Sequence, residues 1–207
     1  MKGIVGRKLG MTQVFDEETG QVTSVTVIEA GPCPVVSVKQ ADVDGYDAVQ
    51  VAYGEVAEHR LSKPKLGHLK KNNVDGAYRR LLELRGLTGA TEGESVTVES
   101  FEPGEKVKVS GISHGKGFAG TIKRHRFHRG PTSHGSHNIR KPGSIGASAT
   151  PSRVFKGRRM PGRMGGKRVT QIGLVVHQVV PEENLLLVKG AVPGPKNAFV
   201  EVREEIK

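Results

Sequence analysis

The chain has 207 residues, which is enough for one domain with a hydrophobic core and a smaller appendage but not for two large domains. Its 32 Lys and Arg against 21 Asp and Glu give a net charge of +11, which favours a polyanionic partner. No run of apolar residues is long enough to predict a membrane span, and no secretory apolar stretch follows Met1-Lys2, so we expect a cytoplasmic protein. The single Cys33 agrees with a reducing compartment.

Short β-like runs, separated by turn residues such as Asp44-Gly45 and Pro103-Gly104, dominate the first half of the chain. They predict strands at residues 3–8, 12–15, 22–28, 35–39, 48–53, 96–98 and 107–109. The exception is the segment 62–71, where Ser62 is a suitable cap and Pro64 suits the first turn of a short helix.

Residues 113–168 have a different composition, with 11 Gly, 14 Lys and Arg, and no periodicity of a strand or a helix. Such a stretch buries too little apolar surface to offset the cost of ordering its backbone, about 1–2 kcal/mol per residue. We therefore expect it to become ordered on its partner. Because β-like runs return at 174–180, 185–188 and 199–202, we predict a discontinuous, mainly β domain of residues 1–112 and 169–207, with 113–168 as an extended loop.

The charge is concentrated in residues 106–181, which contain 16 Lys and Arg and neither Asp nor Glu. A solvated surface normally mixes both signs to limit self-repulsion, so this segment predicts contact with phosphates. The candidate RNA-binding residues are Lys116, Lys123, Arg124, His125, Arg126, His128, Arg129, His134, His137, Arg140, Lys141, Arg153, Lys156, Arg158, Arg159, Arg163, Lys167 and Arg168. Phe118, Phe127 and Phe155 could stack on unpaired bases or pack on the folded domain. A second basic cluster, at 63–71, fits RNA contact and ordinary surface charge equally well.

The run Gly115-Lys116-Gly117-Phe118-Ala119-Gly120 matches the dinucleotide-binding fingerprint. That motif requires a helix behind the glycines and an acid about 20 residues further on for the ribose. The following residues predict no helix, and the next acid is Glu182, so we expect no cofactor. Positive φ or close approach of another backbone explains the glycines better. The candidate positions are Gly115, Gly117, Gly120, Gly143, Gly146 and Gly157.

Two histidine pairs, His125 with His128 and His134 with His137, have spacings that suit metal ligands. The surrounding cations would repel a divalent ion, so we expect no metal and assign these histidines to bases or phosphates. No nearby acid could orient a catalytic histidine either. The chain is therefore predicted to bind RNA without being an enzyme. An RNA-modifying enzyme with a basic arm and a general RNA chaperone are the alternatives.

Residues 1–12, with the sequence MKGIVGRKLGMT, resemble the N-terminus of the bacterial form of large-subunit ribosomal protein three. Residues 111–120 (GISHGKGFAG) with Arg124 resemble the signature of this family, and similar motifs at 142–146, 154–157 and 184–194 extend the resemblance along the chain. The resemblance implies a translation-protein-type β-barrel that binds 23S rRNA near its 3′ end early in assembly and contacts large-subunit proteins fourteen and nineteen. The loop is expected to brace rRNA near the peptidyl transferase centre, with residues 146–153 innermost.

Two positions depart from the family pattern. Lys108 stands where the signature usually has Asp or Asn, so a polar cap made there is expected to be lost or replaced. Ala147-Ser148-Ala149 stands where some bacterial relatives carry a methylated glutamine, so that modification is expected to be absent.

Overall fold

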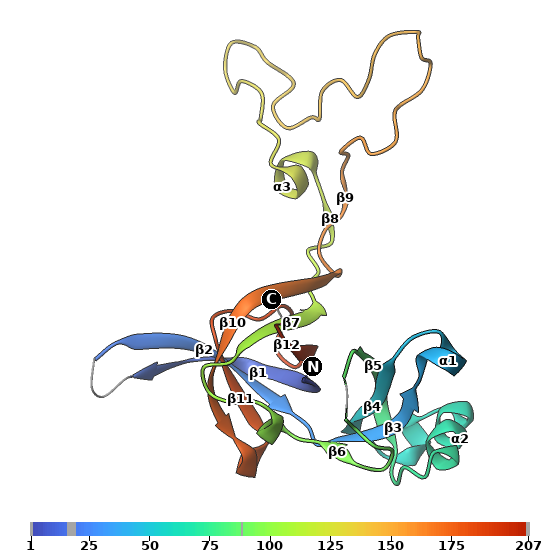
Figure 1. The fold of residues 1–207 in the computed structure, drawn as a ribbon. Coiled ribbons are helices and arrows are strands. Elements are labelled where there is room, and N and C mark those ends of the chain that lie inside the picture. Colours follow the sequence, from blue (N-terminus) through green and yellow to red (C-terminus); the bar gives the residue numbers. More distant parts are fainter. Residues whose placement is uncertain (1, 16–19, 88, 206–207) are drawn as a thin grey trace. The chain divides into compact units, whose positions relative to one another are not determined.

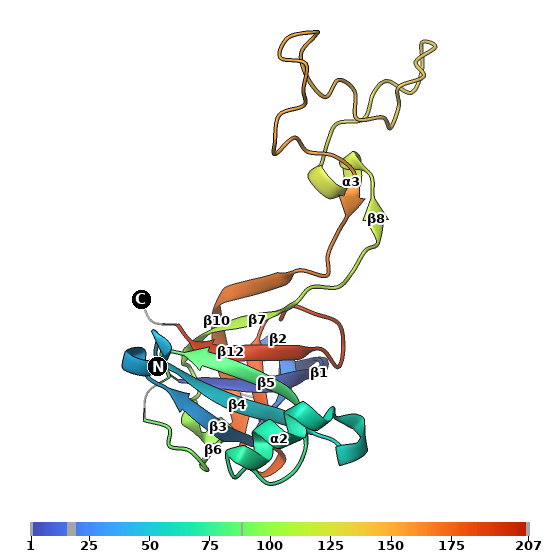
Figure 2. The ribbon, with the colours of Figure 1, turned by 90° about the vertical axis from the view of Figure 1, so that its right-hand side faces the viewer.

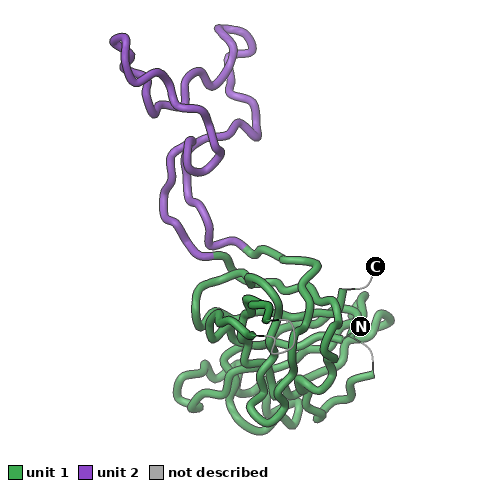
Figure 3. Tube along the Cα trace, turned by 90° about the vertical axis from the view of Figure 1, so that its left-hand side faces the viewer, with its two compact units in different colours: residues 1–113, 168–207 green, residues 114–167 purple. Residues whose placement is uncertain are grey.

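The computed structural model describes residues 2–15, 20–87 and 89–205 (Figure 1). The chain divides into two compact units, one formed by residues 1–113 and 168–207 and the other by residues 114–167 (Figure 3). The sequence-based division placed its boundaries at 112/113 and 168/169, one residue from those of the two units.

Six strands close a barrel in the first unit, in the order β1-β12-β7-β10-β11-β2, and every neighbouring pair is antiparallel. These strands are β1 (Gly3–Phe15), β2 (Val22–Ala30), β7 (Lys106–Ile112), β10 (Arg168–Val180), β11 (Leu185–Lys189) and β12 (Phe199–Glu204). Closure pairs the edges that an open sheet would expose. The mainly β fold with a barrel that the sequence predicts is confirmed.

The barrel core is formed by side chains at alternate positions along these strands. In β7, Val107 and Val109 are fully buried, while the neighbouring Lys106 is exposed and Lys108 half-buried, as the period of two requires. Ile4, Ile28 and Leu186 fill the same core and are 0 % exposed. Burying each such side chain contributes about 1.5–3 kcal/mol, so the barrel has an internal source of stability.

A second sheet lies in the same unit, with the order β5-β4-β3-β6 (Figure 2). Its strands are β3 (Cys33–Lys39), β4 (Ala48–Glu55), β5 (Tyr78–Arg85) and β6 (Ser95–Val96). Residues such as Val35, Val51 and Leu84 pack into one continuous core with the barrel residues. The two sheets of this unit therefore share one hydrophobic core.

The helix predicted at 62–71 is present as α2 (Lys63–Lys71), with proline in its first turn. Leu69 is buried in a small satellite core with Val36, Ala52 and Val74. Ser62 occupies the N-cap position as predicted, but its side chain makes no capping hydrogen bond. None of the helices that the structure describes is long and apolar enough to cross a membrane.

Several elements differ from the sequence-based expectation. β1 joins the two predicted runs 3–8 and 12–15 into one strand, with a shift of register between Lys8 and Gly10. β5 was not predicted, because its charged and leucine residues do not alternate and because it is an edge strand in which only Leu84 is buried. The short α1 (Ala41–Asp44) and the 3-10 turns η1 (Glu58–Arg60) and η3 (Pro181–Glu183) also lacked a sequence signal. Of the strand predicted at 96–98, Val96 lies in β6, whereas Val98 begins the 3-10 turn η2 (Val98–Ser100).

Candidate nucleic-acid interface

A short two-stranded ladder begins the second unit. β8 (Phe118–Ala119) pairs antiparallel with β9 (Gly162–Arg163). The backbone N–H of Lys116 donates to the Met164 carbonyl at 2.9 Å, and that of Met164 donates to the Gly117 carbonyl at 2.9 Å. Between residues 126 and 161 the chain forms turns and bends without helix or strand (Figure 2). Regular structure in this unit is therefore confined to the ladder and the short helix that follows it.

A five-residue helix, α3 (Thr121–His125), follows the ladder and ends at Arg126 in the left-handed conformation, φ 59°. The prediction that no helix follows the glycine run is therefore wrong. A helix of this length buries only Thr121 and has no apolar periodicity to reveal it. The acid that a dinucleotide site needs is still absent from residues 106–181.

Two candidate residues on α3 contact the backbone of Met160, which lies shortly before β9 in the chain. The Arg124 guanidinium donates to the Met160 carbonyl at 2.7 Å, and the His125 Nε2 lies 3.0 Å from the same oxygen. Both side chains are half-buried, whereas the other sixteen candidates are exposed. Arg124 and His125 therefore brace the unit, and Arg124 also adds to its positive charge.

The candidates fall into three groups by position. Beside the ladder and α3 lie Lys116, Lys123, Arg124, His125, Arg163 and Lys167. In the open stretch lie Arg126, His128, Arg129, His134, His137, Arg140, Lys141, Arg153, Lys156, Arg158 and Arg159. Arg168 alone lies in the first unit. The second unit as a whole carries 13 Lys and Arg, 5 His and no carboxylate side chain. No negative side chain within the unit offsets the repulsion between these cations, so bound phosphates would relieve it.

Some exposed groups in the open stretch are arranged by local contacts. The Arg153 guanidinium lies over the Phe155 ring, 5.6 Å from its centroid, and Arg158 donates to the Ser144 carbonyl. Phe118 and Phe155 are 80 % and 60 % exposed, which leaves their rings available for stacking. Phe127 is half-buried beside His125, with the ring centroids 6.1 Å apart.

The six candidate glycines differ among themselves. Gly117, Gly143 and Gly157 adopt positive φ, whereas a Cβ at Gly115, Gly120 or Gly146 would meet nothing within 4 Å. Close approach within the unit occurs instead at four glycines that the sequence did not single out. Gly165 lies against the His114 carbonyl and Gly130 against the Asn138 carbonyl, while Gly162 and Gly166 lie against the guanidinium groups of Arg124 and Arg163.

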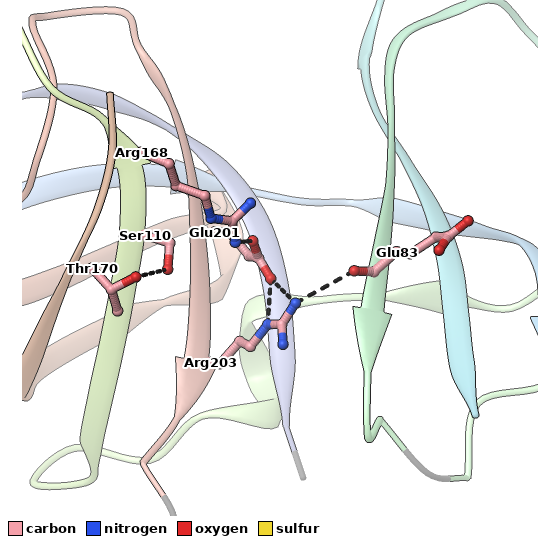
Figure 4. Close-up of polar contacts among 6 residues, drawn as sticks. All are labelled: Glu83, Ser110, Arg168, Thr170, Glu201 and Arg203. Atoms are coloured by element: carbon pink, nitrogen blue, oxygen red, sulfur yellow. Dashed lines mark hydrogen bonds and ion pairs between the residues drawn. The ribbon is translucent and has the colours of Figure 1, made fainter. Parts of the chain in front are cut away.

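Arg168 differs from the other candidates because a buried carboxylate binds it (Figure 4). The Glu201 side chain on β12 is 6 % exposed and accepts hydrogen bonds from Arg168 and from Arg203. Arg203 also donates to the backbone carbonyl of Glu83 on β5 at 3.4 Å. Sequence reasoning missed Glu201, since it lies 33 residues beyond Arg168 and outside the acid-free segment.

The described residues contain no group of three or more His, Cys, Asp or Glu side chains arranged to hold a metal ion. Cys33 is fully buried, and burial raises the pKa of its thiol to about 12, which makes a thiolate nucleophile unfavourable.

Comparison with known proteins identifies the family. A family model described as Ribosomal protein L3 matches residues 87–183. The large ribosomal subunit protein uL3 of Acidothermus cellulolyticus is 56 % identical over 210 residues, covering 100 % of this chain and 94 % of the relative. The chain belongs to the ribosomal protein L3 family. Proteins of the same name from Synechococcus sp. and Streptomyces coelicolor are each 52 % identical, covering 99 % and 100 % of this chain and 95 % and 97 % of the relatives.

Membership in the L3 family confirms the resemblance that the sequence motifs show along the whole chain. The family consists of structural ribosomal proteins, so the prediction that the chain is not an enzyme is confirmed as well.

Proposed function

We propose that this chain binds 23S rRNA in the large subunit of cytoplasmic ribosomes, with residues 114–167 as the principal RNA-binding element. The observation that carries the proposal is the charge of that unit: thirteen exposed or half-buried Lys and Arg and no carboxylate. Contact with phosphates releases condensed counterions, which drives binding of such a segment to RNA. The first unit supplies the stable fold that carries it.

The second unit also lacks the apolar core that would hold one conformation without a partner. Among its residues, Ala119 and Thr121 are the buried ones. Its ordering would therefore be coupled to binding, which suits a segment that threads between RNA helices. The eighteen candidate cations and histidines and the six candidate glycines are the groups proposed to approach the RNA.

The finer parts of the proposal rest on the family resemblance. They are early assembly onto the 3′ region of 23S rRNA, bracing of rRNA near the peptidyl transferase centre with residues 146–153 innermost, and contacts with large-subunit proteins fourteen and nineteen. A general RNA chaperone would share the charge but would bind unrelated RNA as tightly, so the ratio of the two affinities distinguishes the functions.

The test measures the affinity of the full chain for a 23S rRNA 3′ fragment and for unrelated RNA between 50 and 200 mM salt. One variant replaces Arg153, Lys156, Arg158 and Arg159 with Gln. A control variant replaces four exposed cations outside the second unit, Arg60, Arg85, Lys189 and Lys196, with Gln. Since each lost phosphate contact reduces the slope of log K against log salt by about 0.7–0.9, we expect the first variant to lose about 3 from its slope.

The control variant has the same net charge as the first and should keep most of the original slope. Equal losses in the two variants would contradict the assignment of binding to residues 114–167. Equal affinity of the unaltered chain for both RNAs would instead favour the chaperone.

A further inference from the structure

A groove of about 180 Å³ lies in the first unit, outside residues 114–167. One wall is formed by Arg80 and Leu82 of β5. The other is formed by residues 110–112 of β7, Arg168 of β10 and residues 199–201 of β12. All of these residues belong to the same compact unit, so the groove is defined by one folded body.

The strand register explains why these side chains converge. Ser110 is paired with Glu201 on one side and with Thr170 on the other, so the three residues form one row across β12, β7 and β10. Paired residues in antiparallel strands point to the same face of a sheet. Arg168, paired with Ile112, lies two residues along from this row and shares its face. Figure 4 shows this face, with Arg203 reaching across to Glu83 on β5.

The charge of the groove is positive. Glu201 is the acid in its lining, and its two carboxylate oxygens are already bound, one by Arg168 and the other by Arg203. Arg80 on the opposite wall is the second guanidinium of the lining and is exposed to solvent. A guanidinium has five N–H donors, so the bond of Arg168 to Glu201 leaves it able to bind an anion. Glu201 thereby orients Arg168 without cancelling the charge of the site.

Part of the lining of the groove is apolar. Phe199, Val200 and Ile112 contribute to it, and Ile112 is 53 % exposed. The Arg80 guanidinium lies over the Phe199 ring, 5.0 Å from its centroid, and so presents a planar cation to the groove. Arginine planes and aromatic rings are the surfaces on which unpaired bases stack. Pockets for cofactor-sized ligands are about 300–1,000 Å³, so a groove of this volume suits one smaller planar group.

We propose that this groove binds one unpaired nucleotide of the rRNA, with the base against Ile112 and the Arg80 plane and the phosphate on Arg80 and Arg168. The proposal rests on the RNA-binding function but adds a contact outside the second unit. Four of the nine lining residues, 110–112 and Arg168, belong to the acid-free segment 106–181. This continuity favours RNA over an acidic protein segment as the occupant.

A larger cavity in the same unit, of about 400 Å³, is a weaker candidate. Arg7 and Arg79 line it, but so do Glu29 and Glu55. Arg7 is already bound to Glu29 through two hydrogen bonds, at 3.1 and 2.7 Å. The positive and negative charges that line this cavity balance, so the cavity attracts an anion less strongly than the smaller groove does.

The test compares two neighbouring substitutions in the full chain, Arg80→Gln and Arg79→Gln. Both remove one positive charge from exposed positions on β5, but only Arg80 lines the groove. We expect Arg80→Gln to weaken binding of the 23S rRNA 3′ fragment about tenfold near physiological salt and to reduce the salt slope by about 1. Arg79→Gln should stay within about twofold of the unaltered chain. Matching melting temperatures would show that both variants fold.

A second measurement identifies the occupant. Ultraviolet cross-linking of assembled large subunits, followed by mass spectrometry, should find a nucleotide attached to a peptide that contains residues 80–82 or 110–112. Arg80→Lys should keep the salt slope, because the charge remains, but should reduce that cross-link, because an ammonium does not stack. A protein cross-linked at these peptides in place of a nucleotide would overturn the proposal.

The outcomes separate this inference from the proposed function. If the four-Gln variant of residues 153–159 loses affinity while Arg80→Gln and Arg79→Gln bind equally well, the second unit binds RNA and the groove does not. If the four-Gln variant keeps its affinity and slope, the proposed function itself fails, whatever the groove does. A selective loss in Arg80→Gln with a nucleotide cross-link supports the groove.

Discussion

The two units of this chain obtain order in different ways. The first unit has a continuous core in which Ile4, Ile28 and Leu186 are completely buried, and several of its cations have carboxylate partners such as Glu29, Glu83 and Glu201. In the second unit, Ala119 is the one buried hydrophobic residue described, and no carboxylate is present. The lack of a core and the lack of counter-charge thus occur in the same residues. A segment with both properties depends on an external polyanion for its order.

The largest effect is expected when the second unit is removed from the chain. Replacing residues 114–167 with a short Gly-Ser linker should leave the barrel folded, because β7 and β10 remain paired to each other and to their neighbours. Affinity for the 23S rRNA 3′ fragment should fall by about 10³-fold or more, since most phosphate contacts are removed. Circular dichroism and binding titrations measure the two effects. Loss of folding would show that the barrel depends on the second unit.

Substitutions in each unit test whether the hydrophobic core lies in the first unit alone. Leu186→Ala removes a fully buried side chain and should lower the free energy of unfolding of the first unit by about 2–5 kcal/mol. Phe155→Ala, in the second unit, removes a ring that is 60 % exposed and should change that free energy by less than about 0.5 kcal/mol. Urea titrations measure both values. Similar losses in the two variants would contradict the absence of a core in residues 114–167.

The smallest expected effect concerns the pH dependence of the stability of the first unit. Every Asp and Glu side chain lies outside the second unit, so carboxylate titration affects the first unit. Hydrogen bonds from Tyr46, at 2.8 Å, and from Lys39 hold the pKa of Glu83 below its usual 4.5. The pKa is lower in the folded state, so this stabilisation is present above the unfolded value and is lost as pH falls through the folded value. Glu83→Gln should therefore reduce the loss of unfolding free energy between pH 5 and 3 by about 0.5 kcal/mol.

Tyr46→Phe serves as the matched variant, since it removes the larger cause of the shift while leaving the carboxylate in place. Its pH profile should resemble that of Glu83→Gln. A profile identical to that of the unaltered chain would show that the Tyr46 hydroxyl does not stabilise the ionised form of Glu83.

Most of the barrel was predictable because its strands alternate or form short β-branched runs, and α2 was predictable from Pro64 and its leucine spacing. β5 was not, because an edge strand buries little and its sequence can therefore depart from alternation. α3 was not, because it is stabilised by contacts to the Met160 carbonyl, 36 residues from Arg124, and not by local periodicity. Within the candidate site, composition revealed the cations but not their partners.

The sequence by itself determined the segregation of charge, the mainly β character and the family of this protein, since composition, periodicity and motifs are properties of local sequence. Only the tertiary structure decided which cations are partly engaged within the chain. Arg124 meets the Met160 carbonyl and Arg168 meets Glu201, over separations of 36 and 33 residues. It also decided that β5 lies across from β7 and β12 to form a positively charged groove. Such contacts depend on the path of the chain and the register of its strands, which no local pattern encodes.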